Sequence, residues 1–157
     1  MSAPVRLVDA ANAAQTAAIG RLLHDFNREF DEPIVPEATW LAQRIASLIE
    51  GGDTDVLLVG KDPEGLAVLR YQRSIWTEGL ECYVAELYVV PARRGHGLGR
   101  ALMEAAMARS RDRGGDYMLL GTSETDTVAR ALYERLGFVN RERGPDGPTM
   151  YFYEREL

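Results

Sequence analysis

The sequence is poor in the residues that build disulfides and metal sites, with a single cysteine, Cys82, and two histidines, His24 and His96, among 157 residues. One cysteine excludes a disulfide within the chain. Cys82 lies in an apolar stretch, so it is interpreted as a small core residue and not as a nucleophile. Neither histidine has a second ligand at metal-binding spacing. The sequence therefore predicts no metal site.

Long apolar runs and excess positive charge are also missing. No apolar run approaches the roughly 20 residues that cross a bilayer, and the N-terminus lacks the charged start and apolar core of a signal peptide. The formal net charge is −6, which argues against a general nucleic-acid or membrane-surface binder and favours cationic partners. We expect a single cytoplasmic domain over residues 1–157, either alone or as a homodimer.

The most informative stretch is glycine-rich and lies between residues 86 and 100. A run rich in β-branched residues stops at Pro91 and leads through three alternating glycines into an apolar helical pattern over residues 98–113. Glycines let backbone N–H groups approach a ligand, and the helix adds the positive end of its dipole. Three arginines surround this point: Arg93, Arg94 and Arg100. The stretch predicts a site for a multiply charged anion such as a pyrophosphate.

Two common phosphate loops do not fit this stretch. The nucleoside-triphosphate loop ends in Gly-Lys-Ser/Thr, whereas Gly99 is followed by Arg100. The dinucleotide fingerprint needs a third glycine at position 100 and an acidic residue about 20 positions further on. Neither is present.

What remains, Val-x-Pro-x-x-Arg-Gly-x-Gly-x-Gly from Val89 to Gly99, resembles the acetyl-CoA loop of the GNAT superfamily of N-acetyltransferases. From the loop alone, an ordinary strand-to-helix turn is the alternative. A second motif follows in the family's order, because Ala-x-x-x-Tyr-x-x-x-Gly-Phe from Ala129 to Phe138 resembles its closing helix. Asp126 stands where the family often has asparagine, and an aspartate there can cap the helix.

The resemblance, which covers about residues 83–140, implies an enzyme that transfers the acetyl group of acetyl-CoA directly to an amine, without a metal. Backbone groups of Leu87 and Val89 would contact the pantetheine arm and the thioester. The other implied cofactor-binding residues are Arg94, Gly95, His96, Gly97, Leu98, Gly99, Arg100 and Asp126.

Two side chains are the catalytic candidates. Tyr133 matches the family's general acid, and without the resemblance it would be interpreted as core packing. Glu86 is our candidate base, because a carboxylate on an otherwise apolar strand beside the loop invites a raised pKa. The alternatives are a structural role for Glu86, with Glu81 or water taking the proton.

The acceptor is not specified beyond a small-molecule or peptide amine. Acceptor sites in this family draw on the first two helices and the last hairpin, which makes the lining candidates Asn27, Glu29, Phe30, Trp40, Trp76, Tyr151 and Tyr153. A non-catalytic acetyl-CoA-binding sensor of the same fold and an unrelated phosphate-binding protein stay open as alternatives.

The predicted fold is α+β and GNAT-like, with four helices and a mixed, mostly antiparallel sheet of six to seven strands. Alternation along residues 81–90 places Val84, Glu86 and Tyr88 on one face of the central strand. Residues 117–120 are expected to form a buried strand, and residues 138–143 and 150–156 a final hairpin. The acidic side of the first helix, which carries Glu29, is either solvated or a rim that attracts cations.

Overall fold

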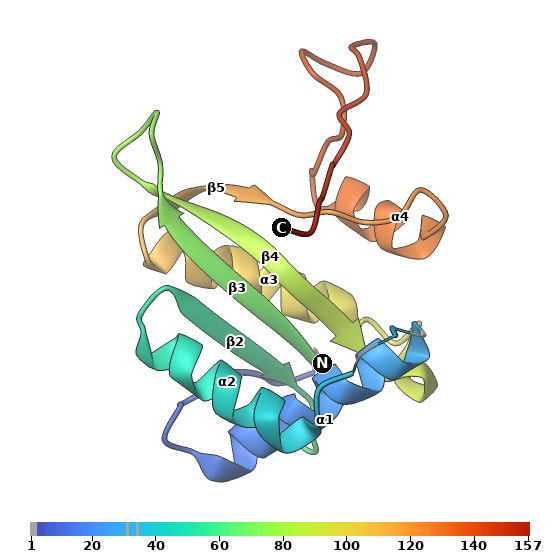
Figure 1. The fold of residues 1–157 in the computed structure, drawn as a ribbon. Coiled ribbons are helices and arrows are strands. Elements are labelled where there is room, and N and C mark those ends of the chain that lie inside the picture. The colour runs from blue at the N-terminus through green and yellow to red at the C-terminus, as the bar shows by residue number, and fades with distance from the viewer. Residues whose placement is uncertain (1–2, 31, 34) are drawn as a thin grey trace. The chain divides into compact units, whose positions relative to one another are not determined.

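The structure is a computed structural model that describes residues 3–30, 32–33 and 35–157 (Figure 1). The chain divides into two compact units, residues 1–120 and residues 121–157. Each is described by itself below.

The first unit is built on a five-stranded sheet in the order β1-β2-β3-β4-β5. Its strands are β1 (Val5–Leu7), β2 (Thr54–Val59), β3 (Gly65–Arg73), β4 (Leu80–Val89) and β5 (Gly115–Leu119). The first three pairings are antiparallel and the β4–β5 pairing is parallel. The expected mixed, mostly antiparallel sheet is therefore confirmed.

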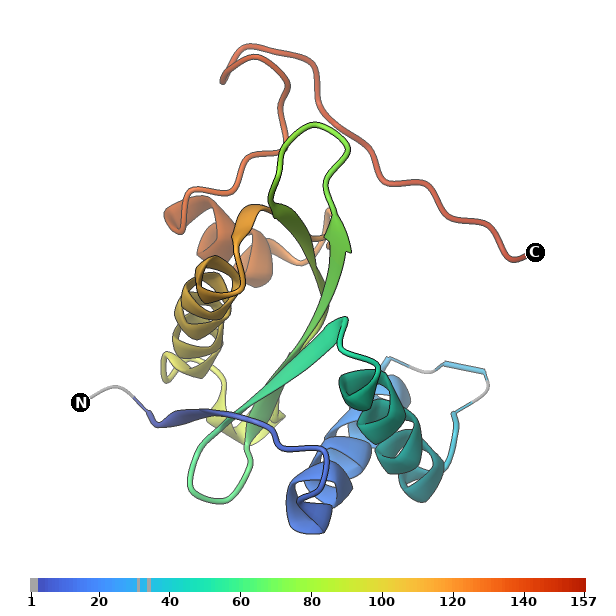
Figure 2. The ribbon, with the colours of Figure 1, turned by 90° about the vertical axis from the view of Figure 1, so that its left-hand side faces the viewer.

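Helices cover both faces of this sheet (Figure 2). On one face lie α1 (Ala13–Glu29) and α2 (Ala38–Glu50), and on the other lies α3 (Leu98–Asp112). The apolar stripe predicted for the first helix packs as expected, with Ile19 and Leu22 buried against the sheet. On the α3 face Leu102 and Met103 are fully buried, and so is Cys82 of β4, as predicted for a core residue. The sheet thus forms the middle layer of the unit.

A β-bulge in β4 changes which residues share a face. Val68 of β3 lies opposite Glu86, but the next residue, Leu69, lies opposite Val84, so Ala85 is the extra residue. Directly opposed residues share a face. Val68 belongs to the core under α1 and α2, so Glu86 faces these two helices. The prediction that Val84 shares this face is wrong, because the bulge moves Val84 to the α3 face.

The strand β5 is less buried than its unbroken apolar sequence predicts. Tyr117 is 61% exposed and Leu119 is 38% exposed. An unbroken apolar sequence indicates that a strand can be buried on both faces. It does not show which elements cover the two faces of that strand.

The second unit contains α4 (Thr127–Arg135) and the C-terminal residues. Asp126 caps α4 as predicted, since its side chain accepts a hydrogen bond from the Ala129 N–H at 3.1 Å. The helix is followed by Gly137 at φ 91°, a left-handed conformation that glycine adopts without steric cost.

The expected sheet of six to seven strands is wrong, because the described residues form five. The final hairpin is reduced to one bridge, between Arg141 and Thr149, and residues 150–157 form no strand. Two prolines near the turn, Pro145 and Pro148, cannot donate to a ladder. An isolated two-stranded hairpin is also marginal without an apolar face to cover, and the Tyr151 and Tyr153 rings are exposed.

Candidate active site

The glycine-rich stretch forms the predicted strand–loop–helix junction at the end of β4. A short 3₁₀ turn, Pro91–Arg93, leads into a loop in which Gly95 and Gly97 have φ of 77° and 81°. Gly97 is the N-cap of α3, and Gly99 lies in the first helical turn. A Cβ placed on Gly95 or Gly97 would meet no atom within 4 Å. The space beside the Cα atoms of these two glycines is therefore empty among the described residues.

The anion-binding groups of this junction are backbone N–H groups. The first turn of α3 has N–H groups without partners inside the helix, and they lie at the positive end of its dipole. The Arg94 carbonyl contacts the His96 ring through Nδ1 at 2.9 Å, which ties two loop residues together. This arrangement suits a phosphate or pyrophosphate.

The three arginines of the motif contact carboxylates. Arg93 Nε lies 3.1 Å from Glu64 Oε1, and Arg100 Nε lies 2.8 Å from Glu104 Oε1. The Arg94 guanidinium binds both carboxylate oxygens of Glu29 at 2.6 Å. All three positions lie at the junction, as the motif predicts, and their positive charges are partly balanced by acidic neighbours.

The strand β4 has an open edge where it approaches the loop. It pairs with β5 only from Leu80 to Tyr83. The Val90 N–H donates to the Glu64 carbonyl at 2.9 Å, on the β3 side, so alternation turns the backbone groups of Leu87 and Val89 to the other side. The Val89 carbonyl accepts a hydrogen bond from Arg94 Nε at 3.0 Å. The two N–H groups of this edge thus face away from the sheet, at the positions that the sequence singled out.

Glu86 lies on the same strand, half-buried and three residues before Val89, or roughly 10 Å along an extended strand. Burial raises the pKa of the Glu86 carboxyl group. No hydrogen bond or ion pair to this carboxylate is found among residues 3–30, 32–33 and 35–157. A carboxyl group in such surroundings gives up and takes up protons nearer neutral pH than an exposed one.

The alternative base, Glu81, has different surroundings. Its carboxylate accepts hydrogen bonds from Gln72 Nε2 at 2.9 Å and from Ser74 Oγ at 3.3 Å. It lines a cleft of about 440 Å³ with Trp76, Tyr117 and three smaller side chains. The Glu81 carboxylate is therefore already engaged by two side chains, whereas no such partner of Glu86 is found among the described residues.

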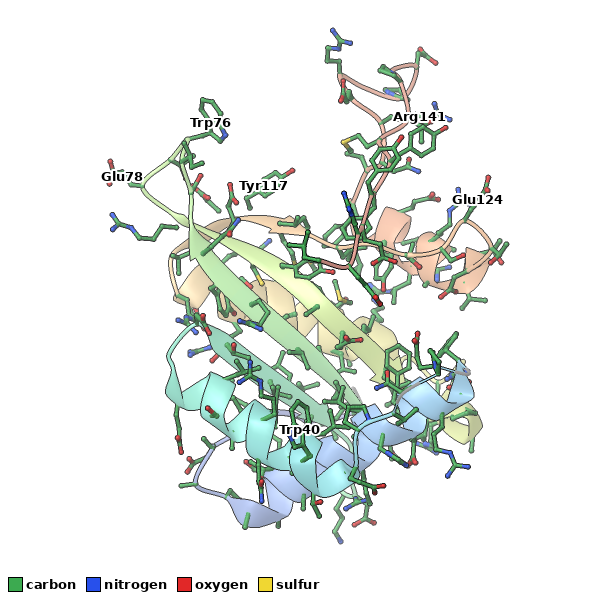
Figure 3. The ribbon with its side chains drawn as sticks, in the orientation of Figure 1. Trp40, Trp76, Glu78, Tyr117, Glu124 and Arg141 are labelled. Atoms are coloured by element: carbon green, nitrogen blue, oxygen red, sulfur yellow. The ribbon has the colours of Figure 1, made fainter. Side chains whose placement is uncertain are left out.

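The acceptor candidates of the first unit do not form one group. Trp40 lies on α2, while Trp76 lies at the tip of the β3–β4 hairpin, far from it in Figure 3. Phe30, just after α1, packs on Phe26 with ring centroids 5.2 Å apart, and Phe26 packs on Tyr88 at 4.9 Å. The end of α1, with Asn27 and Glu29, is therefore attached to the same half of β4 as the glycine-rich loop.

Tyr133 and Asp126 belong to the second unit, as do Tyr151 and Tyr153. Burial raises the pKa of Tyr133 to about 12, and the charge of Asp126 adds to the effect. The Tyr133 ring meets Phe138 edge to face, with centroids 6.0 Å apart. Tyr133 therefore keeps its proton throughout the neutral range.

Sequence reasoning missed the contact that holds Arg94. Glu29 was expected on a solvated face or beside the acceptor, and Tyr88 was assigned only to a strand face. The two partners Glu29 and Arg94 are 65 residues apart in the sequence, and no local pattern links a helix end to a distant loop.

The described part of the chain holds no group of three or more His, Cys, Asp or Glu side chains placed to bind a metal ion. Within the same residues, no helix combines the length and the apolar character needed to cross a membrane.

Comparison with known proteins gives matches of three kinds. Residues 19–138 match the model of the acetyltransferase (GNAT) family. A mycothiol acetyltransferase of Thermobispora bispora is 36% identical over 120 residues, which is 74% of this chain but 35% of that protein. A streptothricin acetyltransferase of Streptomyces lavendulae is 34% identical over 94 residues, 57% of this chain and 48% of that protein. The chain thus spans less than half the length of either relative.

Two solved structures illustrate the likeness of the fold. One from Arthrobacter sp. FB24 is 43% identical, covers 98% of this chain and 96% of its own, and has a TM-score of 0.84. An aminoglycoside acetyltransferase from an uncultured soil metagenomic sample, crystallised with sisomicin, has a TM-score of 0.74 at 13% identity, with 98% and 97% covered. The second likeness concerns the fold alone.

Proposed function

Since this chain belongs to the acetyltransferase (GNAT) family, we propose that it is an enzyme that transfers the acetyl group of acetyl-CoA directly to an amine. The observation that carries the proposal is the succession of backbone donors along β4 and into α3. The open edge at Leu87 and Val89 is followed at once by the glycine loop and the helix N-terminus. This order matches a long ligand with a reactive group at one end and a pyrophosphate further along.

In this proposal the coenzyme is held by backbone groups. The pyrophosphate binds at residues 94–100, where the N–H groups of the loop and the first turn of α3 complement its charge. The pantetheine arm follows the open edge of β4. An N–H group of this edge, at Leu87 or Val89, polarises the thioester carbonyl and stabilises the negative charge that develops on its oxygen.

Glu86 is the proposed base. An alkylammonium group has a reference pKa of about 10.4, so it must lose a proton before its nitrogen attacks the thioester carbon. Glu86 takes that proton, directly or through a water molecule, and its raised pKa makes it a better acceptor than an exposed carboxylate. As the C–N bond forms, the C–S bond breaks and the coenzyme leaves as a thiolate.

Tyr133 is the proposed donor to the leaving sulfur. At a pKa of about 12 its hydroxyl is protonated, whereas a thiol resembling cysteine has a pKa of about 8.5. Because the two pKa values differ by this much, complete transfer of the proton from the Tyr133 hydroxyl to the thiolate is unfavourable by about 5 kcal/mol. We therefore assign to Tyr133 a hydrogen bond to the developing thiolate, with a proton following from the solvent after the bond has broken.

The proposed acceptor is a small, cationic amine. The relatives named for mycothiol and streptothricin support a small molecule over a protein, and the net charge of −6 favours a cation. The apparent affinity for such an acceptor should fall as salt is added, because salt screens the attraction between the cationic amine and the acidic side chains of the protein.

The proposal is tested by titrating acetyl-CoA into the protein in a calorimeter, and then by screening amines for release of the coenzyme thiol. Saturable binding together with turnover of at least one cationic amine is the expected result. Binding with no turnover across a broad amine library would support the non-catalytic sensor. Absence of binding would contradict the proposal as a whole.

Valine at Gly97 should weaken acetyl-CoA binding by about 10- to 100-fold, because a branched side chain blocks the approach of the ligand to the loop backbone. The matched control is Gly52→Val. Gly52 has a similar φ of 89° and equally empty surroundings, so both variants incur a similar backbone strain of roughly 1–2 kcal/mol. Equal coenzyme affinities in the two variants, measured by calorimetry, would show that this loop is not the site.

A further inference from the structure

The side chain of Arg94 is held between the end of α1 and the end of β4. Its guanidinium makes two 2.6 Å hydrogen bonds to the Glu29 carboxylate, one to each oxygen. Its Nε donates to the Val89 carbonyl at 3.0 Å. The guanidinium carbon also lies 5.7 Å from the centre of the Tyr88 ring. Arg94 thus bridges the last residue of a helix and the last residue of a strand.

The residues that contact Arg94 are themselves packed in the core or held by its charge. Tyr88 is 4% exposed and belongs to the core between the sheet and the helices α1 and α2. The Tyr88 ring also packs on Phe26 of α1. The Arg94 guanidinium and the nearby Tyr88 hydroxyl hold the pKa of Glu29 below its usual value, so Glu29 is ionised at neutral pH.

Arg94 is also the residue at which the loop begins. The loop then passes through Gly95 and Gly97, both in the left-handed region. Glycine has access to many backbone conformations, so a loop of this kind binds tightly only when something outside it fixes its course. The bridge supplies a fixed point directly before the first glycine.

We propose that Glu29 and Tyr88 are positioning residues that hold the phosphate loop through Arg94, so that coenzyme affinity depends on the last turn of α1. The inference rests on the proposed function in that it takes the loop to be the coenzyme site. It adds that a residue of the first helix, far away in sequence, sets the conformation in which the loop binds.

The negative charge of Glu29 allows a test that distinguishes positioning from a direct effect of charge on the coenzyme. A carboxylate near an anion site repels the anion, so if Glu29 acted through its charge alone, Glu29→Gln would tighten coenzyme binding. Release of Arg94 toward the phosphates would tighten it further. Positioning predicts the opposite sign, because the amide of Gln lacks the two equivalent anionic oxygens that the guanidinium grips.

The experiment measures acetyl-CoA affinity by calorimetry for the wild type, Glu29→Gln, Glu29→Asp and Glu50→Gln. Glu50 is the matched control, since it is the last residue of α2 as Glu29 is of α1, and no ion pair of Glu50 is found in the described residues. Glu29→Asp keeps the charge but is one methylene shorter, so it cannot reach both nitrogens in the same way.

We expect about five- to tenfold weaker binding for both Glu29 variants and wild-type binding for Glu50→Gln. Melting temperatures should stay within about 2 °C of the wild type, because a partly exposed ion pair contributes little to folding. In turnover assays the KM for acetyl-CoA should rise by the same factor, while kcat at saturating acetyl-CoA stays unchanged.

Three results would overturn the inference: tighter or unchanged binding in Glu29→Gln, wild-type binding in Glu29→Asp, or a loss of kcat with KM unchanged. Removal of Arg94 gives a further check, because Glu29→Gln should no longer weaken coenzyme binding in an Arg94→Ala background. A wild-type protein that does not bind acetyl-CoA would instead contradict the proposed function, so the two failures are distinguishable.

Discussion

Replacement of Tyr133 by phenylalanine should lower turnover by about 10²- to 10⁴-fold and leave acetyl-CoA affinity nearly unchanged. Phenylalanine keeps the edge-to-face contact with Phe138 and removes only the hydroxyl group that would stabilise the leaving sulfur. Turnover is measured by thiol release at saturating amine and acetyl-CoA, and affinity by calorimetry.

The matched control is Tyr71→Phe. Tyr71 is also a buried tyrosine whose pKa is raised to about 12 by burial, but its hydroxyl lies 3.5 Å from Ser110 Oγ of α3. The control should keep wild-type turnover. If Tyr133→Phe does so as well while the chemical step limits the rate, Tyr133 is a core residue and another group assists the leaving thiolate.

The pKa of Tyr133 also determines the alkaline side of the pH profile. A donor must be protonated to act, so its contribution is present at every pH below its pKa and is lost as the pH rises through it. With a value of about 12, the rate should show no falling limb due to Tyr133 up to about pH 10.

Glu86→Gln should lower kcat/KM by about 10²- to 10³-fold near neutral pH, because the variant cannot accept the proton of the amine. The loss should be largest at pH values just above the raised pKa of Glu86, where the wild-type base is ionised and deprotonation of the amine is still hard. It should shrink as the pH approaches the pKa of the amine itself, since the free amine then no longer needs a base. Full pH profiles of the two enzymes provide the measurement.

In the wild type, Glu86 must be ionised to act as the base. Burial raises its pKa, so the acidic limb of the profile should lie at higher pH than for an ordinary carboxylate, and the rate should fall as the pH drops through that raised value. An unaltered profile in Glu86→Gln would show that Glu86 is not the base. Glu81→Gln tests the alternative carboxylate in the same way, because the acidic limb of the pH profile should disappear only in the variant that lacks the base.

Folding stability should change in the opposite direction from activity. A carboxyl group whose pKa is higher in the folded than in the unfolded state disfavours folding at pH values above its folded pKa, where burial keeps a charge out of water. Glu86→Gln removes that charge. The variant should therefore be at least as stable as the wild type at neutral pH, which thermal unfolding at several pH values would check.

Most elements of the first unit could be predicted because their signals are local. The stripe that includes Ile19 and Leu22 defined a helix, and the glycines at 95, 97 and 99 defined a strand-to-helix junction. The prediction of a final hairpin was wrong because it depended on a signal that is not local. Residues 150–156 have a strand-like composition, but a strand also needs a partner along its length.

In the candidate site, the placement of backbone groups could be predicted from the sequence, whereas side-chain contacts between distant elements could not. The backbone groups of Leu87 and Val89 were inferred from the motif, and the structure turns them to the open edge of β4. Glu29 was assigned to a solvated face or to the acceptor region, as the resemblance implied. Its contact with Arg94 could not be predicted, because that contact depends on how α1 packs on the sheet. A charge pattern along one helix cannot reveal a partner that folding brings in from another element.

The extra residue in β4 also affects how this chain is compared with others. Before Ala85 and after it, side chains alternate in two different phases relative to the sheet. A homologue with one residue fewer here would pair just as well along β3, yet Glu86 and its counterpart would point to opposite sides. An alignment that overlooks a one-residue deletion within residues 83–87 would therefore equate Glu86, which faces α1, with a side chain that faces α3. The role of base proposed for Glu86 would then be transferred to the wrong residue.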